Sequence, residues 1–213
     1  MRRARGMSLI EVMVAASLTL VLMGVIWGGM QVLRRTTLSV RASQEPRKQL
    51  RVALQNLQND VRAASYIFPD GTYNVNGVNR TIEPPGTSGS FLALAIPENS
   101  VSPLTFSVAL FYSDARPKTD PRNPTAQSLF YHKPTGVDPP LSDLPGEIDL
   151  EALPANGTSK VFDAYLRAGD GFQVETSANQ HAVTFRFNIE RREAKGELQA
   201  STYQTTLTLR NTI

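Results

Sequence analysis

An uninterrupted apolar run near the N-terminus constrains the fold of this chain more than any other feature. From Val12 to Leu33 no residue carries a formal charge. A bilayer core of about 30 Å is spanned by roughly 20 helical residues, because each residue advances the helix by about 1.5 Å. The sequence therefore predicts a transmembrane helix at about residues 12–33.

Three interpretations compete for this segment. A cleaved secretory signal has a shorter apolar core of about 7–15 residues, followed by a small-residue cleavage site; the run here is longer, and no such site follows it. A plain signal anchor fits the length but leaves Glu11 unexplained, because a carboxylate at the centre of such a helix costs roughly 2.5–3.5 kcal/mol on insertion scales. The third interpretation is a basic leader that is cut between Gly6 and Met7.

The stretch RGMSLIEVMVA, from Arg5 to Ala15, resembles the processing site of type IV pilins and type II secretion pseudopilins. In that family a membrane-embedded prepilin peptidase cuts after a glycine and methylates the new amino group. The resemblance implies a leader peptide of residues 1–6 that ends at Gly6, a methylated mature N-terminus at Met7, and Glu11 as the fifth mature residue. Met7 departs from the family pattern, which more often has phenylalanine at this position.

The resemblance also gives Glu11 a role. Met7 and Glu11 are four residues apart, so on one helix they face the same side. In the family picture this carboxylate meets the N-terminal amine of a neighbouring pilin in the filament, and such a buried ion pair is costly to break on one side. The alternative is a glutamate that reaches the membrane interface. The resemblance further implies a single-pass protein of the inner membrane, with its head outside the cytoplasm before assembly into a filament.

The charge balance of the chain depends on the leader. The formal net charge is +3, and three leader arginines account for the surplus, because 22 basic residues minus 3 leaves 19, which equals the 19 acidic residues. Without the leader the chain is formally neutral, and the loop sequence DARPKTDPRN mixes both signs of charge, so DNA is a weakly supported partner. The absence of cysteine excludes disulfides, thiolate zinc sites and cysteine nucleophiles.

Helical signals continue beyond the apolar run. Apolar residues recur at spacings of four and three along one face: Leu50, Leu54, Leu57, Val61 and Ala64. Pro46 predicts a bend, because proline removes a helix hydrogen bond and clashes with the preceding turn. The sequence predicts one helix over residues 7–67, bent near Pro46, with the stripe as a core face because it is too short for a coiled coil.

The rest of the chain, residues 68–213, is expected to form a β-rich head. Apolar or alternating runs bounded by turn residues predict strands at Phe91–Ile96, Leu104–Tyr112, Ser128–His132, Lys160–Leu166, Gly171–Thr176, Val183–Ile189 and Tyr203–Leu209. Residues 69–90, 114–127 and 133–159 are expected to be long loops. The predicted fold class is α+β, with the apolar face of an antiparallel sheet covering the helix stripe.

No catalytic arrangement emerges from the sequence. His132 and His181 are the two histidines, and neither has the spacing of a metal site. Acidic and glycine-bearing stretches match neither a calcium loop nor a phosphate loop. The sequence predicts no enzyme, no cofactor and no metal.

Two further stretches of sequence indicate a subgroup within this family. LQNLQNDVRAASYI, at the end of the helix, and TTLTLRN, near the C-terminus, are similar to the minor subunits of the PilW and J-type pseudopilin group. This similarity implies a minor subunit that initiates or caps a filament for pilus assembly, protein secretion or DNA uptake. The alternative is a filament-associated adaptor whose head contacts DNA or a secreted substrate. A membrane-anchored enzyme is the third and least supported hypothesis.

Overall fold

The computed structural model describes residues 8–75, 77–98, 105–137, 150, 153, 155–192 and 197–209, without the side chains of residues 35 and 38–43. The chain divides into two compact units, Met1–Gln44 and Glu45–Ile213. Helix α1 (Leu9–Ala63) contributes residues to both units. We call the second unit the head.

The first unit contains the apolar part of α1. Residues Leu9–Arg34 have a mean hydropathy of 2.4, are long enough to cross a membrane and are not buried by other parts of the chain. Two hydroxyl groups in this segment bond back to the helix: Ser17 Oγ donates to the Val14 carbonyl at 2.9 Å, and Thr19 Oγ1 to the Ala15 carbonyl at 2.8 Å. Because a hydrocarbon environment offers no partner for polar groups, this local satisfaction suits a membrane segment.

The end of α1 differs slightly from the predicted boundary. The helix ends at Ala63, because Tyr66 and Ile67 form the short strand β1 (Tyr66–Ile67), which pairs with β4 (Phe91–Pro97). Helical backbone continues through Pro46, and the bend expected there stays a prediction.

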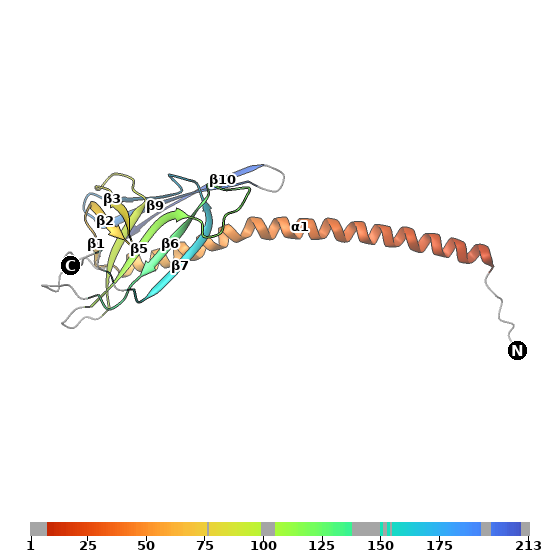
Figure 1. Ribbon diagram of the computed structural model, residues 1–213, viewed down its shortest axis with the longest axis horizontal. Helices are drawn as coiled ribbons and strands as arrows, with labels where there is room; N and C mark the ends of the chain where they lie inside the picture. The colour runs from red at the N-terminus through yellow and green to blue at the C-terminus, as the bar shows by residue number, and fades with distance from the viewer. Residues whose placement is uncertain are drawn as a thin grey trace. The chain divides into compact units, whose positions relative to one another are not determined.

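The head contains a large antiparallel sheet, which confirms the α+β class. Within the described residues it has eight strands in the order β1-β4-β5-β6-β7-β9-β10, and β8 also pairs with β9 (Figure 1). The further strands are β4 (Phe91–Pro97), β5 (Phe106–Ala115), β6 (Gln127–Lys133), β7 (Thr158–Leu166), β8 (Phe172–Thr176), β9 (Ala182–Arg192) and β10 (Leu198–Thr208). Each predicted strand overlaps one of these.

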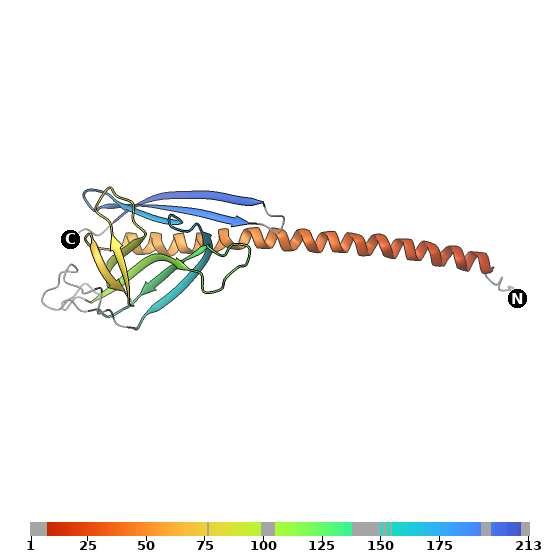
Figure 2. The same ribbon diagram turned by 45° about the horizontal axis from the view of Figure 1, so that its top comes forward.

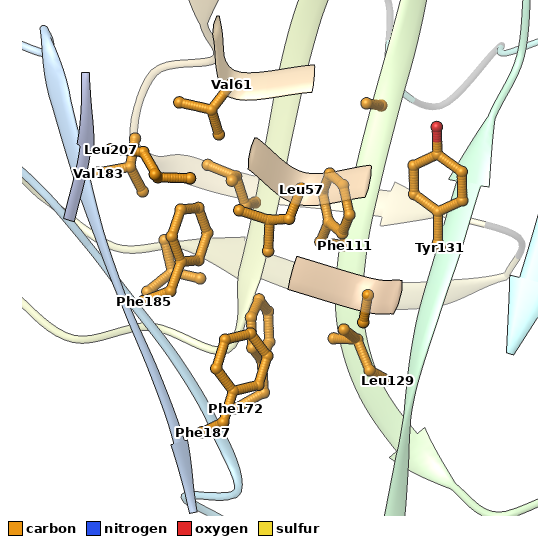
Figure 3. Packing of buried hydrophobic residues seen from close by; sticks show 14 of the residues in the cluster. Leu57, Val61, Phe111, Leu129, Tyr131, Phe172, Val183, Phe185, Phe187 and Leu207 are labelled. Carbon is orange, nitrogen blue, oxygen red and sulfur yellow. The ribbon is translucent and has the colours of Figure 1, made fainter. Parts of the chain in front are cut away.

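The curled sheet wraps around the head part of α1. Figure 2 shows this part of the helix between β9 and β10 on one side and β5, β6 and β7 on the other. In the close view, Leu57 lies between the aromatic rings of Phe172 and Phe185 and those of Phe111 and Tyr131 (Figure 3). The predicted stripe is confirmed as a core face. Its members Leu50, Leu57, Val61 and Ala64 are at most 2% exposed, and Leu54 packs half-buried against them.

This packing leads to a stability prediction. We expect a chain that begins at Arg47 to be soluble and to unfold cooperatively, because the stripe is covered within one unit. Leu57→Ala should lower its free energy of unfolding by about 2–5 kcal/mol, because Leu57 is fully buried. Val52, on the same helix, is 40% exposed, and Val52→Ala should change stability by no more than about 0.5 kcal/mol. Urea unfolding followed by circular dichroism measures both; equal effects would contradict the packing.

The opposite face of β4 and β5 carries a second buried layer. Its members include Phe91, Phe106, Val108 and Leu110 from the sheet, together with Val75 and Ile82 from a separate hairpin. This hairpin is formed by β2 (Gly71–Val75) and β3 (Val78–Ile82). Central strands of the sheet are therefore buried on both faces, which explains why β4 reads as a continuous apolar run.

The hairpin corrects the expectation of a loop over residues 69–90. Arg80 of β3 holds it to the sheet: the guanidinium pairs with Asp114 at 2.8 Å and lies 3.5 Å from the centre of the Tyr112 ring. The hairpin signal was present in the sequence, because Asn-Gly between alternating residues typically forms a two-residue hairpin turn. Gly77 has φ of 79°, a conformation that favours glycine at such a turn.

Candidate functional site

The candidate site lies at the start of α1, where Ser8 and Glu11 form a reciprocal cap. The Ser8 backbone N–H donates to Glu11 Oε2 at 2.8 Å, and the Glu11 backbone N–H donates to Ser8 Oγ at 3.3 Å. This is the capping-box arrangement, in which two backbone donors that the helix cannot satisfy find side-chain acceptors. A carboxylate in the first turn is also favoured by the helix dipole.

Glu11 therefore has a partner within its own chain. Ser8 was not among the predicted site residues, although Ser8 and Glu11 have the S-x-x-E spacing that typically marks a capping box. Gly6 and Met7 lie outside the described residues, so their predicted roles in cleavage and methylation, and the pairing of Glu11 with an N-terminal amine, stay predictions.

The helix that follows this cap presents an open apolar surface. Its large apolar side chains are exposed, for example Leu18 at 59% and Met23 at 66%. A Cβ atom added at Gly24 or Gly28 would meet no atom within 4 Å. The surface is thus available to lipid or to helices of neighbouring subunits.

Ionisable groups of the head hold elements together. Asp60 of α1, which is 6% exposed, accepts a hydrogen bond from Lys133 Nζ of β6 at 2.8 Å. Burial, and secondarily the nearby Asp60 carboxylate, raises the pKa of Tyr131 far above its usual range. The pair of Asp60 and Lys133 therefore ties the helix to the sheet.

The two histidines, His132 and His181, do not form a metal site with other side chains among the described residues. His132 Nδ1 is 2.6 Å from Ser159 Oγ, and burial lowers the pKa of His132. His181 follows the turn that joins β8 to β9, and its carbonyl accepts from the Leu209 N–H. Among the described residues, no group of three His, Cys, Asp or Glu side chains is placed to hold a metal ion.

The connection from β5 to β6, expected to be a long loop, is firmly attached to β7. Arg116 donates to both carboxylate oxygens of Asp163, at 2.6 and 2.5 Å, and lies 3.9 Å from the centre of the Tyr165 ring. The Tyr165 hydroxyl in turn donates to Asp120 at 3.1 Å. Tyr165 has φ of 54°, which is unusual for a residue other than glycine. The loop is thus a fixed part of the head surface.

A cavity of about 250 Å³ lies beside this loop. Arg122, Arg167, Arg192 and Glu190 line it. Arg167 is already engaged by Asp170, which forms a two-pronged ion pair with it. The lining therefore mixes both signs of charge.

The structure thus combines a capped apolar helix, long enough to cross a membrane, with an α+β head. The family model described as "Prokaryotic N-terminal methylation motif" matches residues 1–27. No curated protein and no solved structure matches the chain. The motif and the apolar helix together support the type IV pilin and pseudopilin family, a structural family. They imply processing by prepilin peptidase and assembly with other pilins.

Proposed function

We propose that the chain is a minor pilin or pseudopilin, a structural subunit that initiates or caps a type IV pilus-like filament. The methylation motif carries this proposal, because it covers residues 1–27 and thus includes the cap and the first part of a helix whose apolar side chains are not covered by other parts of the chain. Such a helix needs lipid before assembly and neighbouring helices afterwards. The machine that it serves would be one for pilus assembly, protein secretion or DNA uptake.

The minor role rests on the similarity of the helix end and the C-terminal strand to minor subunits. In this proposal the protein is a single-pass protein of the inner membrane, with its head outside the cytoplasm, and later lies near the filament tip.

Glu11 has two successive partners in this proposal. In the free subunit its carboxylate caps its own helix through the Ser8 N–H. In the filament the same carboxylate forms an ion pair with the N-terminal amine of a neighbouring subunit. Cleavage after Gly6 creates this positive amine. An ammonium group is the stronger partner in an apolar bundle, because a charge-assisted bond outweighs one to a neutral amide.

The proposal is tested by the mature N-terminus. N-terminal sequencing and mass spectrometry of the protein from membranes should show a chain that begins at Met7 and carries one methyl group on its amine. Cells without prepilin peptidase should yield a chain that begins at Met1. A mature chain that begins after Trp27 would identify a conventional signal and contradict the proposal.

The adaptor hypothesis has one observation in its favour, the cavity beside the β5–β6 loop with Arg122 and Arg192 in its lining. Glu190 lines the same cavity, and Asp170 engages Arg167. Since DNA binding depends on clustered positive charge, this mixed lining favours the structural subunit over a DNA-binding adaptor.

A further inference from the structure

The last strand of the head sheet has an open edge. β10 pairs with β9 in unbroken register, from Leu198 opposite Arg192 to Thr208 opposite Ala182, and with no other strand among the described residues. At the other end of the sheet, β1 is only two residues long. β10, with 11 residues, is therefore the longer of the two terminal strands of this sheet.

The hydrogen-bond phase of this pair shows which backbone groups face outward. The Leu209 N–H donates to the His181 carbonyl at 2.9 Å, and these residues continue the register of β9 and β10. In an antiparallel pair, hydrogen-bonded and non-hydrogen-bonded positions alternate. The odd-numbered residues of β10 thus bond to β9, whereas the N–H and C=O groups of six even-numbered residues point to the open edge: Leu198, Ala200, Thr202, Gln204, Thr206 and Thr208.

This edge lacks the features that normally prevent strand addition. Proteins protect edge strands with charged side chains, prolines, bulges or very short strands. β10 has 11 residues, contains no charged residue, proline or glycine, and shows no bulge against β9. The strand is held in place along its outer face, where Thr206 Oγ1 lies 2.9 Å from Thr184 Oγ1 and Thr202 Oγ1 donates to Asn188 Oδ1 at 2.9 Å.

We propose that the open edge of β10 is a docking edge that receives an extended segment of a different filament subunit as an additional strand. This inference rests on the proposed function, because a subunit that initiates or caps a filament has other subunits as its neighbours. A row of alternating backbone donors and acceptors is matched by another extended backbone. The partner segment is uncharged and rich in β-branched residues, since threonines on the exposed face of β10 favour such cross-strand neighbours.

Proline substitution isolates the edge from the rest of the head. The Thr206 N–H faces the open edge, so Thr206→Pro removes an edge donor and leaves the hydrogen bonds to β9 in place. Without the Thr206 N–H, a carbonyl group of the partner strand is buried without a hydrogen bond. Recovery of the full-length Thr206→Pro variant in sheared filaments should therefore fall about tenfold, compared with wild type at equal membrane abundance. Thermal unfolding of the full chain in detergent checks that the variant is folded.

A matched pair of lysine variants controls for the lost hydroxyl contact. Thr206→Lys and Thr184→Lys both remove the hydroxyl contact between Thr184 and Thr206, but only Thr206 belongs to the edge strand. Recovery in filaments should fall for Thr206→Lys, because an edge lysine opposes strand addition. It should stay within about twofold of wild type for Thr184→Lys, because a surface substitution usually has a small effect.

Hydrogen exchange gives a readout specific to strand pairing. In the full chain in detergent, the amides of Ala200, Thr202, Gln204 and Thr206 should exchange fast, whereas odd-numbered amides of β10 exchange slowly. In purified filaments the even-numbered amides should become slow as well. Wild-type recovery of Thr206→Pro, or even-numbered amides that stay fast in filaments, would overturn the inference while leaving the proposed function intact.

Two other outcomes are also decisive. The chain alone could form a dimer in detergent that Thr206→Pro dissociates. This result would assign the edge of β10 to a second copy of the chain and overturn the inference that a different subunit binds there. A wild-type chain that stays uncut at Gly6 and absent from filaments would overturn the proposed function and this inference together.

Discussion

Replacing Gly6 by leucine is expected to leave the whole protein as an uncut precursor in the membrane. A peptidase site that accepts glycine has little room for a branched side chain, so cleavage between residues 6 and 7 should fall by at least about a hundredfold, the effect of lost near-attack geometry. The precursor keeps Met1 and its leader arginines, lacks a free amine at Met7, and should be missing from filaments.

Gel mobility and N-terminal sequencing of the membrane fraction measure this effect. Gly6→Ala is the graded control, because it adds a single methyl group and should be cut more slowly than wild type but faster than Gly6→Leu. Ala4→Leu places the same bulk two residues upstream and should be cut normally. Efficient cutting of Gly6→Leu would show that the cleavage site lies elsewhere.

The second large effect is expected at Glu11, where charge and helix capping can be separated. Glu11→Gln keeps the capping box, because glutamine serves at this position as well as glutamate, but it removes the charge. Membrane insertion and cleavage after Gly6 should continue, since both depend on the leader and the apolar run. Recovery in filaments should fall about tenfold or more, because a neighbour's amine is left without its counter-charge in an apolar bundle.

Comparison with two further variants decides the cause. Glu11→Ala removes both charge and cap, and Ser8→Ala removes only the hydroxyl that accepts from the Glu11 N–H. If charge controls assembly, Glu11→Gln and Glu11→Ala lose recovery equally and Ser8→Ala resembles wild type. If Glu11→Gln instead resembles wild type while Glu11→Ala and Ser8→Ala lose recovery, Glu11 acts only as a helix cap. A subunit at a filament tip uses this contact with fewer neighbours, so residual recovery of Glu11→Gln is expected.

Local sequence patterns predicted most of the head. The spacing of Leu50, Leu57 and Val61 identified the buried helix face, and alternation identified β9 and β10, because one face of each lies in the core. The hairpin of β2 and β3 was missed because its polar residues resemble a loop, although the turn at Gly77 marked it. The continuous apolar run of β4 predicted a strand but not the second layer that covers its other face.

The candidate site was predictable only in part. The motif around Gly6 and Glu11 is recognisable from the sequence, whereas the Ser8 cap could be predicted only from the S-x-x-E pattern of helix N-termini. The open edge of β10 could not be predicted, because the order of strands in a sheet depends on pairings between residues distant in sequence. The pairing of β6 with β7 also depends on distant residues: its register shifts between Gln127 and Leu129, and Tyr165, with its positive φ, lies in the matching stretch of β7.

The position of Leu57 in the core has a consequence for the order of synthesis. Leu57 shares its core with Phe185, which follows it by 128 residues. At about 5–20 residues per second, the ribosome reaches Phe185 about 6–26 s after Leu57. During this interval the apolar face of the helix has been made but the strands that will cover it have not. The apolar face of the helix is therefore among the first parts of the head to be made and among the last to be covered.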